Sequence, residues 1–408
     1  MVESAYSARL WPAHVKPQED ELLSSWLLRI AVAHGLKLNL FCAAIWSKGL
    51  VMGRDVDRLS DERVINLIAE GTGVTPMRVA ETTLSAYEGW LFERRNHQGY
   101  TPWIISLRIY CLDRQSFGLQ FCPCCLAQDR EPFFRRLWRL AFVTLCGKHH
   151  TLLLDRCPRC GVAVNAAQNK LSNNATAVTR IMTCCFACGF DLRKGLPGSA
   201  QDQVLPQAID YQRKLQTALQ QGWIEVREGE AVYSHLYFRV LLQIIRLLAN
   251  REKLREAVSR ESGIKMFTPA FAGNNKEIER LSIPHRLALL GMAQFLLSDW
   301  PERFIGFCQQ ERIWSTGWLW RFDDAPYWFW NPIREHLFRP EWSPSEQEIR
   351  SAINHINRVG GVPYKTAISQ LLGVKDAFKL SRAPELLGMV APDHRGRIRR
   401  RKTSMPVL

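Results

Sequence analysis

The sequence predicts a mainly α-helical protein in which helix-turn-helix modules flank two central zinc ribbons. Three observations lead to this prediction: apolar residues at helical spacing on both sides of the chain's middle, cysteine pairs within the middle, and a formal net charge of +15. The 408 residues are enough for two or three domains of ~150 residues. With 47% hydrophobic and 23% charged residues, the composition excludes global disorder.

Residues 1–100 are predicted to form an N-terminal helical, helix-turn-helix-like domain. Glu21–His34 places its apolar residues three and four positions apart, as an amphipathic helix does. A second amphipathic stretch around Val64 leads through glycines to Thr75, a helix N-cap, and Pro76, a first helical residue. This order of helix, turn and capped helix is typical of a helix-turn-helix, although any short helical hairpin fits it equally well.

Residues 196–342 are predicted to form a second helical domain that is rich in tryptophan. Tyr237–Leu248 and Pro284–Leu297 are its most apolar stretches, and seven of the fourteen tryptophans lie between Trp300 and Trp342. Aromatic side chains dominate packing energies, so we expect this region to form a core. A docking surface for a partner is the alternative, since tryptophan is also enriched at binding hot spots.

Residues 343–393 are predicted to form a C-terminal helix-turn-helix-like domain. Ser343 and Glu346 have the spacing of a capping box at its start. A turn at Gly373-Val374 is followed by a helix that would read the DNA groove. On that helix, the candidate DNA contacts are Lys375, Lys379 and Arg382. A purely structural helical bundle is the alternative.

A basic tail, residues 394–408, ends the chain. It has six basic residues and no acid between its first and last cation, which suits a phosphate-binding arm. The candidate contacts are Arg395, Arg397, Arg399, Arg400, Arg401 and Lys402. A solvated tail without a partner is the commoner fate of such runs.

Residues 101–195 carry short β-like runs, such as Trp138–Leu145, and ten of the twelve cysteines. Paired cysteines in a cytosolic chain are metal ligands more often than disulfides. Four ligand pairs follow one another, each with two residues between its members: Cys122 and Cys125, Cys146 and His149, Cys157 and Cys160, Cys185 and Cys188.

Two intervening residues allow a tight turn to direct both ligands at one ion, and the glycines after Cys160 and Cys188 suit the end of such a turn. In the simplest assignment, the first two pairs form a site of three cysteines and one histidine, and the last two pairs form a site of four cysteines. An interleaved arrangement, in which the first and third pairs share an ion, is the alternative. Cys124, Cys184 and His150 adjoin the ligands and are interpreted as packing or surface residues.

Two structural zinc ions per chain are therefore the predicted cofactors, because a catalytic zinc usually keeps one coordination position open. The sequence contains no P-loop, Gly-x-Ser-x-Gly, His-Glu-x-x-His or dinucleotide-binding motif. We expect a protein that is not an enzyme, although dispersed carboxylates for phosphoryl transfer remain compatible with the sequence. No apolar run reaches the ~18 residues of a membrane span, and the N-terminus lacks the features of a signal peptide. A basic protein of the bacterial cytoplasm, associated with nucleoid DNA, is expected.

The chain resembles the TniQ family of transposition proteins, which includes the target selector TnsD. The family's opening, acidic residues before a Ser-Trp-x-x-Arg helix, is similar to Pro17–Ala31. Its central motif is similar to Leu119–Cys125, Leu137–Leu140 and the following ligands, and a weaker likeness spans Pro284–Phe304. The chain departs from the family where Gly147 replaces a frequent proline and His150 a usual glycine, which leaves His149 and His150 as alternative ligands.

The resemblance implies a target selector without catalytic activity. It implies that the protein binds DNA or a guide-RNA target-recognition complex, recruits an AAA+ ATPase regulator and through it the transposase, and works in some cases as a homodimer. Two rival interpretations remain: a zinc-ribbon DNA-binding transcriptional regulator, and a zinc-containing nuclease or recombinase.

We predict that the purified protein contains two zinc ions per chain, measured by mass spectrometry of metals. A DNA-shift assay across salt concentrations on the same sample would show whether it also binds phosphates. A stable, folded protein without zinc would contradict the ligand assignment.

Overall fold

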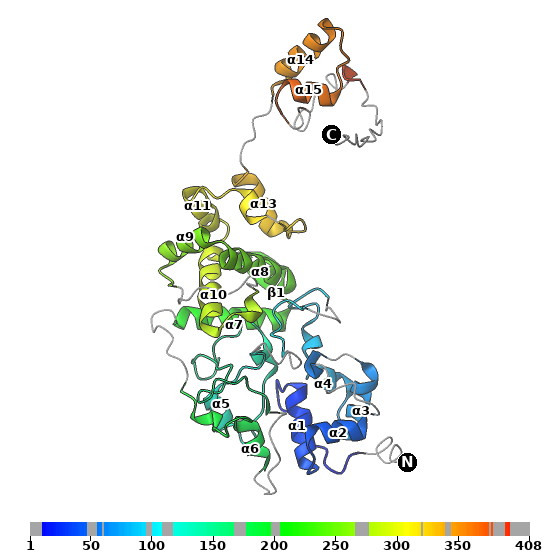
Figure 1. Ribbon diagram of the computed structural model, residues 1–408, viewed down its shortest axis with the longest axis vertical. Helices are drawn as coiled ribbons and strands as arrows, with labels where there is room; N and C mark the ends of the chain where they lie inside the picture. Colours follow the sequence, from blue (N-terminus) through cyan, green and yellow to red (C-terminus); the bar gives the residue numbers. More distant parts are fainter. Residues whose placement is uncertain are drawn as a thin grey trace, which may run out of the picture. The chain divides into compact units, whose positions relative to one another are not determined.

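The protein divides into two compact units, Met1–Phe338 and Arg339–Leu408, and each is described by itself. The computed structural model (Figure 1) describes residues 10–46, 55–58, 61–94, 100–107, 117–166, 177–196, 205–265, 277–319, 321–338, 344–374, 377 and 388–391. Fifteen α-helices and one two-stranded sheet lie in this described part. The mainly helical prediction is confirmed, whereas the five-part division of the chain stays a prediction.

Four helices open the first unit: α1 (Leu23–Ala33), α2 (Leu38–Ile45), α3 (Glu62–Thr72) and α4 (Pro76–Ala80). Both sequence-based helices are present, and the Thr75 hydroxyl caps α4 by accepting from the backbone N–H of Arg78 at 3.3 Å. However, α4 has only five residues, so the helix-turn-helix assignment stays a prediction. No single helix among the described residues is long and apolar enough to cross a membrane; α1 and α2 meet that test only as a pair bent by 92°.

Trp11 anchors the segment before α1 to α3. Its ring is buried, and its backbone N–H donates to Gly71 O at 2.7 Å. A Cβ atom at Gly71 would lie 2.0 Å from Trp11 Cε2, so only glycine permits this approach. The glycine that weakens the end of α3 therefore allows a large apolar side chain to pack there.

The middle of the first unit contains little regular structure. Its described residues form α5 (Pro123–Gln128), α6 (Ala177–Thr183), short 3-10 turns such as Arg136–Arg139 and no longer element. The predicted β-like run Trp138–Leu145 is wrong as a strand, since Leu140 and Leu145 form only isolated bridges. Backbone in this region is held by turns and side chains instead of a sheet ladder.

The remainder of the first unit is helical. It contains α7 (Leu205–Gln221), β1 (Trp223–Arg227), β2 (Glu230–Tyr233), α8 (Ser234–Asn250), α9 (Glu252–Ser262), α10 (Ile283–Leu297), α11 (Glu302–Gln310), α12 (Ser315–Trp318) and α13 (Tyr327–His336). The central helix is α10, which packs against α7, α8, α9 and α11 (Figure 1). The two apolar stretches predicted as helices lie within α8 and α10.

Three tryptophans of the tryptophan-rich region lie in the core, as expected. Trp300, Trp318 and Trp328 are at most 6% exposed. The Trp300 ring stacks on Phe329 at 5.4 Å between centroids, and Phe304 contacts Trp318 at 4.7 Å. These contacts join α11, α12 and α13.

The second unit contains α14 (Glu346–Arg358) and α15 (Lys365–Leu371), which pack through Ile349, Ile353 and Ile368. The predicted capping box at Ser343 is wrong by two residues. The structure places it at Ser345, whose backbone N–H and hydroxyl both donate to Glu348 Oε2, at 2.7 and 2.8 Å. Two overlapping Ser-x-x-Glu patterns begin this helix, and sequence spacing does not rank them.

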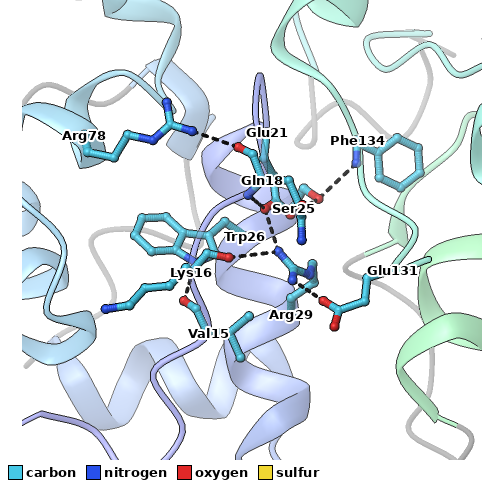
Figure 2. A network of polar contacts seen from close by, with 10 residues as sticks. All are labelled: Val15, Lys16, Gln18, Glu21, Ser25, Trp26, Arg29, Arg78, Glu131 and Phe134. Atoms are coloured by element: carbon cyan, nitrogen blue, oxygen red, sulfur yellow. Dashed lines mark hydrogen bonds and ion pairs between the residues drawn. The ribbon is translucent and has the colours of Figure 1, made fainter. Parts of the chain in front are cut away.

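Three buried arginines connect the middle segment to its surroundings, and the first is Arg29 of α1. It donates to Glu21 Oε2 at 2.7 Å, to Lys16 O at 3.3 Å and to Glu131, which follows α5 (Figure 2). Ser25 extends this network, because it donates to Glu21 Oε1 and accepts from the backbone N–H of Phe134, both at 3.0 Å. The Ser-Trp-x-x-Arg motif therefore fastens α1 to the segment that follows α5.

The second buried cation, Arg139, ties this segment to an N-terminal turn. It donates to Asp57 Oδ2 at 2.7 Å, to Ile105 O at 2.8 Å and to Asp55. Burial alone would lower the pKa of Arg139, but the carboxylates of Asp55 and Asp57 outweigh it and raise the pKa.

The third, Arg286 on α10, reaches the start of the first cysteine motif. It donates to Ala141 O at 2.9 Å and to Gln120 Oε1 at 3.0 Å, and Gln120 Nε2 in turn donates to Trp138 O at 3.0 Å. Burial lowers the pKa of Arg286 to about 10, so the side chain is still charged at neutral pH.

We predict that Arg286→Met destabilises the zinc-loaded protein by about 3 kcal/mol, because Gln120 and Ala141 would lose their charged donor inside the core. Urea unfolding followed by tryptophan fluorescence measures this change. The control is Arg213→Met on α7, whose side chain is 62% exposed and pairs with Asp210, and for which we expect less than about 1 kcal/mol. Equal unfolding midpoints for the two variants would contradict a structural role for Arg286.

Candidate metal centres

The first metal centre brings together Cys122, Cys125, Cys146 and His149. Cys122 is the N-cap of α5 and Pro123 is its first residue, so Cys125 lies one turn along the same helix. His149 Nδ1 lies 3.4 Å from each of the three sulfurs, and Cys125 Sγ lies 3.6 Å from Cys146 Sγ. A tetrahedral zinc with Zn–S bonds of about 2.3 Å requires ligand separations of about 3.8 Å or slightly less, so this geometry fits.

The second metal centre brings together Cys157, Cys160, Cys185 and Cys188. Two of its sulfur pairs, Cys157 with Cys188 and Cys160 with Cys185, are each 3.6 Å apart. In each centre the four ligand atoms lie within 4.8 Å of one another, whereas the interleaved alternative would mix the two sets. The described cysteines are all free of disulfides. The donor sets and distances are compatible with two zinc ions.

Three of the ligand turns share one backbone design. In each, the residue after the second ligand donates its N–H to the carbonyl of the first: His150 to Cys146 at 2.8 Å, Gly161 to Cys157 at 2.9 Å and Gly189 to Cys185 at 2.9 Å. These three residues have left-handed backbones, with φ of 54°, 72° and 69°. The glycines therefore have the role that the spacing suggested.

His150 occupies the glycine position of this design, and His149 is the histidine that joins the three cysteines of the first cluster. The side chain of His150 is exposed, whereas His149 Nδ1 faces the sulfurs. The second ring nitrogen, His149 Nε2, lies 2.9 Å from Gln128 Oε1 at the end of α5. A proton on Nε2 donated to Gln128 leaves the Nδ1 lone pair free for the metal, as the outer partner of a ligating histidine generally does.

Hydrogen bonds favour the thiolate form of one cysteine in each centre, Cys146 in the first and Cys188 in the second. Hydrogen bonds from Cys122 and Cys125 lower the pKa of Cys146 to about 2. The backbone N–H of Phe190 donates to Cys188 and lowers its pKa to about 7. Ligation requires the thiolate form, so these donors favour it at Cys146 and Cys188, whereas burial raises the pKa of Cys157.

Burial differs between the two centres. The three sulfur ligands of the first are at most 4% exposed, whereas Cys160 of the second is an exposed residue. In both, four protein ligands complete a tetrahedron, which is the composition of a structural and not a catalytic zinc site. In a segment with so little regular structure, the metals would take the place of a larger apolar core.

The other candidate residues belong to neither ligand set or lie outside the described residues. Cys124 and Cys184 are half-buried neighbours outside both ligand sets, and Cys111 lies outside the described residues. The candidate DNA contacts all lie outside the described residues as well, so they stay predictions: Lys375, Lys379, Arg382, Arg395, Arg397, Arg399, Arg400, Arg401 and Lys402.

The sequence analysis missed Gln128 and the connecting role of Arg29, Arg139 and Arg286. A charged residue on the apolar face of a predicted helix was the available signal for Arg29 and Arg286. Gln128 is exposed and is followed by ordinary surface residues, so its position alone carries no signal.

These features define a mainly helical protein with two closed candidate metal centres, one of three cysteines and a histidine and one of four cysteines. Residues 12–153 match the family model described as TniQ, so this part of the chain is similar to the TniQ family. The matched segment contains the α1 network and the first metal centre, whereas the second centre and α7–α15 lie beyond it. No curated protein matches the chain.

We predict that His149→Ala lowers the zinc content from two ions to one per chain, because it removes one of four ligands. His150→Gly keeps both ions and raises the free energy of unfolding by up to about 1 kcal/mol, since it relieves a strained left-handed residue. Metal analysis and urea unfolding measure the two effects. Loss of zinc from the His150 variant alone would reverse the ligand assignment.

Proposed function

We propose that this protein is a non-catalytic adaptor that selects the target site for transposition. In this proposal it binds DNA or a guide-RNA target-recognition complex and recruits an AAA+ regulator, which then engages the transposase. The observation that carries the proposal is the TniQ match over residues 12–153. The closed metal centres agree with it, because they offer no open coordination position for a substrate.

DNA binding is proposed from the net charge of +15 and from the basic C-terminal sequence. The contacts would be Lys375, Lys379 and Arg382, with the basic tail adding phosphate contacts. The protein would act inside a bacterial cell, at the nucleoid, and as a homodimer where two partner sites must be bridged.

The test is recruitment in a purified system. We expect the zinc-loaded protein to hold the AAA+ regulator of its transposition system on DNA in the presence of ATP, and omission of the protein to abolish targeted insertion. Cys157→Ser, which breaks the second metal centre, should lose recruitment together with one zinc ion. Cys124→Ser, outside both centres, is the matched control and should retain both.

Two other outcomes would replace this proposal. Tight binding to one operator with no effect of the regulator would indicate a transcriptional regulator. DNA cleavage that requires a divalent cation, and that a single carboxylate substitution abolishes, would indicate a nuclease or recombinase.

A further inference from the structure

We propose that the zinc module, here residues 117–166 and 177–196, binds the phosphates of duplex DNA through a basic surface around α5. This inference rests on the proposed DNA-directed function. It adds a contact site in the first unit to the C-terminal residues already considered.

The charge balance of the zinc module favours a polyanion. The module contains ten lysines and arginines against four aspartates and glutamates, a difference of +6. Two zinc ions held by seven thiolates and one neutral histidine would contribute −3, which leaves about +3. The module therefore stays positive after its metal centres are counted.

All four acids of the module are already paired. Asp129 pairs with Arg135, Glu131 with Arg29, Asp155 with Arg156 and Asp191 with Arg193. Five cations of the module form no ion pair with any described residue: Arg130, Lys148, Arg159, Arg180 and Lys194. They are all exposed, so their charge is available to a partner.

Two of these cations, Lys148 and Lys194, lie on turns beside the short helix α5, and Arg159 lies on a turn that adjoins the second of these. The bond between His149 Nε2 and Gln128 Oε1 places the Lys148 turn beside the end of α5. The 3-10 turn Leu192–Lys194 packs against α5. A Cβ atom at Gly195 would lie 3.2 Å from Pro158 Cγ, so the chain at Lys194 and the Arg159 turn also adjoin.

The metal centres make this surface rigid. Lys148 lies between the ligands Cys146 and His149, and Arg159 lies between Cys157 and Cys160. A ligand turn fixes the backbone on both sides of its tip, so the cation loses little freedom when it meets a phosphate. Phosphate contacts of this kind position a protein on DNA without reading its sequence.

The experiment compares two triple variants of the full-length, zinc-loaded protein on a duplex of random sequence. The test variant is Lys148→Gln, Arg159→Gln and Lys194→Gln. The control removes the same charge from exposed positions outside the module, Lys253→Gln, Lys265→Gln and Arg312→Gln. Fluorescence anisotropy across salt concentrations gives the affinity and its salt slope, and metal analysis gives the zinc content.

We expect the test variant to bind DNA about tenfold or more weakly, with a salt slope reduced by about 2.7 for three lost phosphate contacts. The control should bind with a nearly wild-type slope, and both variants should keep two zinc ions. Weaker binding with lost zinc would overturn the proposal, because the cations would then serve the thiolates and not DNA.

Equal slopes for the two variants would also overturn it. If the wild-type protein still binds DNA in that case, and removal of the basic tail abolishes binding, the proposed function survives without this surface. If the wild-type protein binds no DNA, both the surface and direct DNA recognition by this protein are wrong.

Discussion

A guanidinium group that leaves water must find acceptors for nearly all of its N–H groups, and this requirement decides which segments of the first unit meet. Arg29, Arg139 and Arg286 are each at most 3% exposed, and each has at least one acceptor more than 80 positions away in the sequence. Through these bonds, all three arginines connect the segment around the first metal centre to other parts of the first unit. The motifs that resemble the TniQ family contain all three arginines, and none of the three belongs to a metal ligand set.

The turns of the metal centres satisfy backbone hydrogen-bonding groups that lie close together in the sequence. Between α4 and α7 the described chain has almost no sheet and only brief helices, so few backbone groups are satisfied by regular structure. Turns around the ligands satisfy them instead, with the same N–H to C=O bond repeated at His150, Gly161 and Gly189. The histidine at a position that favours glycine shows that ligand geometry, once fixed, can sustain a strained residue.

Sequence reasoning succeeded where one local pattern decides the structure. Periodicity placed α1, α8 and α10 within a few residues, and ligand spacing identified both metal centres. It failed at Ser345, where two equivalent capping patterns overlap, and at the run from Trp138, whose β-like residues find no neighbouring strand. Sequence reasoning could not identify the partners of Arg286, because Gln120 lies 166 positions away and only the folded chain brings the two residues together.

The contact between Trp11 and Gly71 bears on how this protein can be divided. The family match begins at residue 12, so a fragment cut to residues 12–153 would keep the first metal centre and lose the indole that covers Gly71. Without the indole, the surface of α3 around Gly71 would be exposed to solvent, and exposed apolar surface promotes self-association. At its N-terminal edge, the region of family similarity therefore begins one residue after a side chain that packs into the core of the first unit.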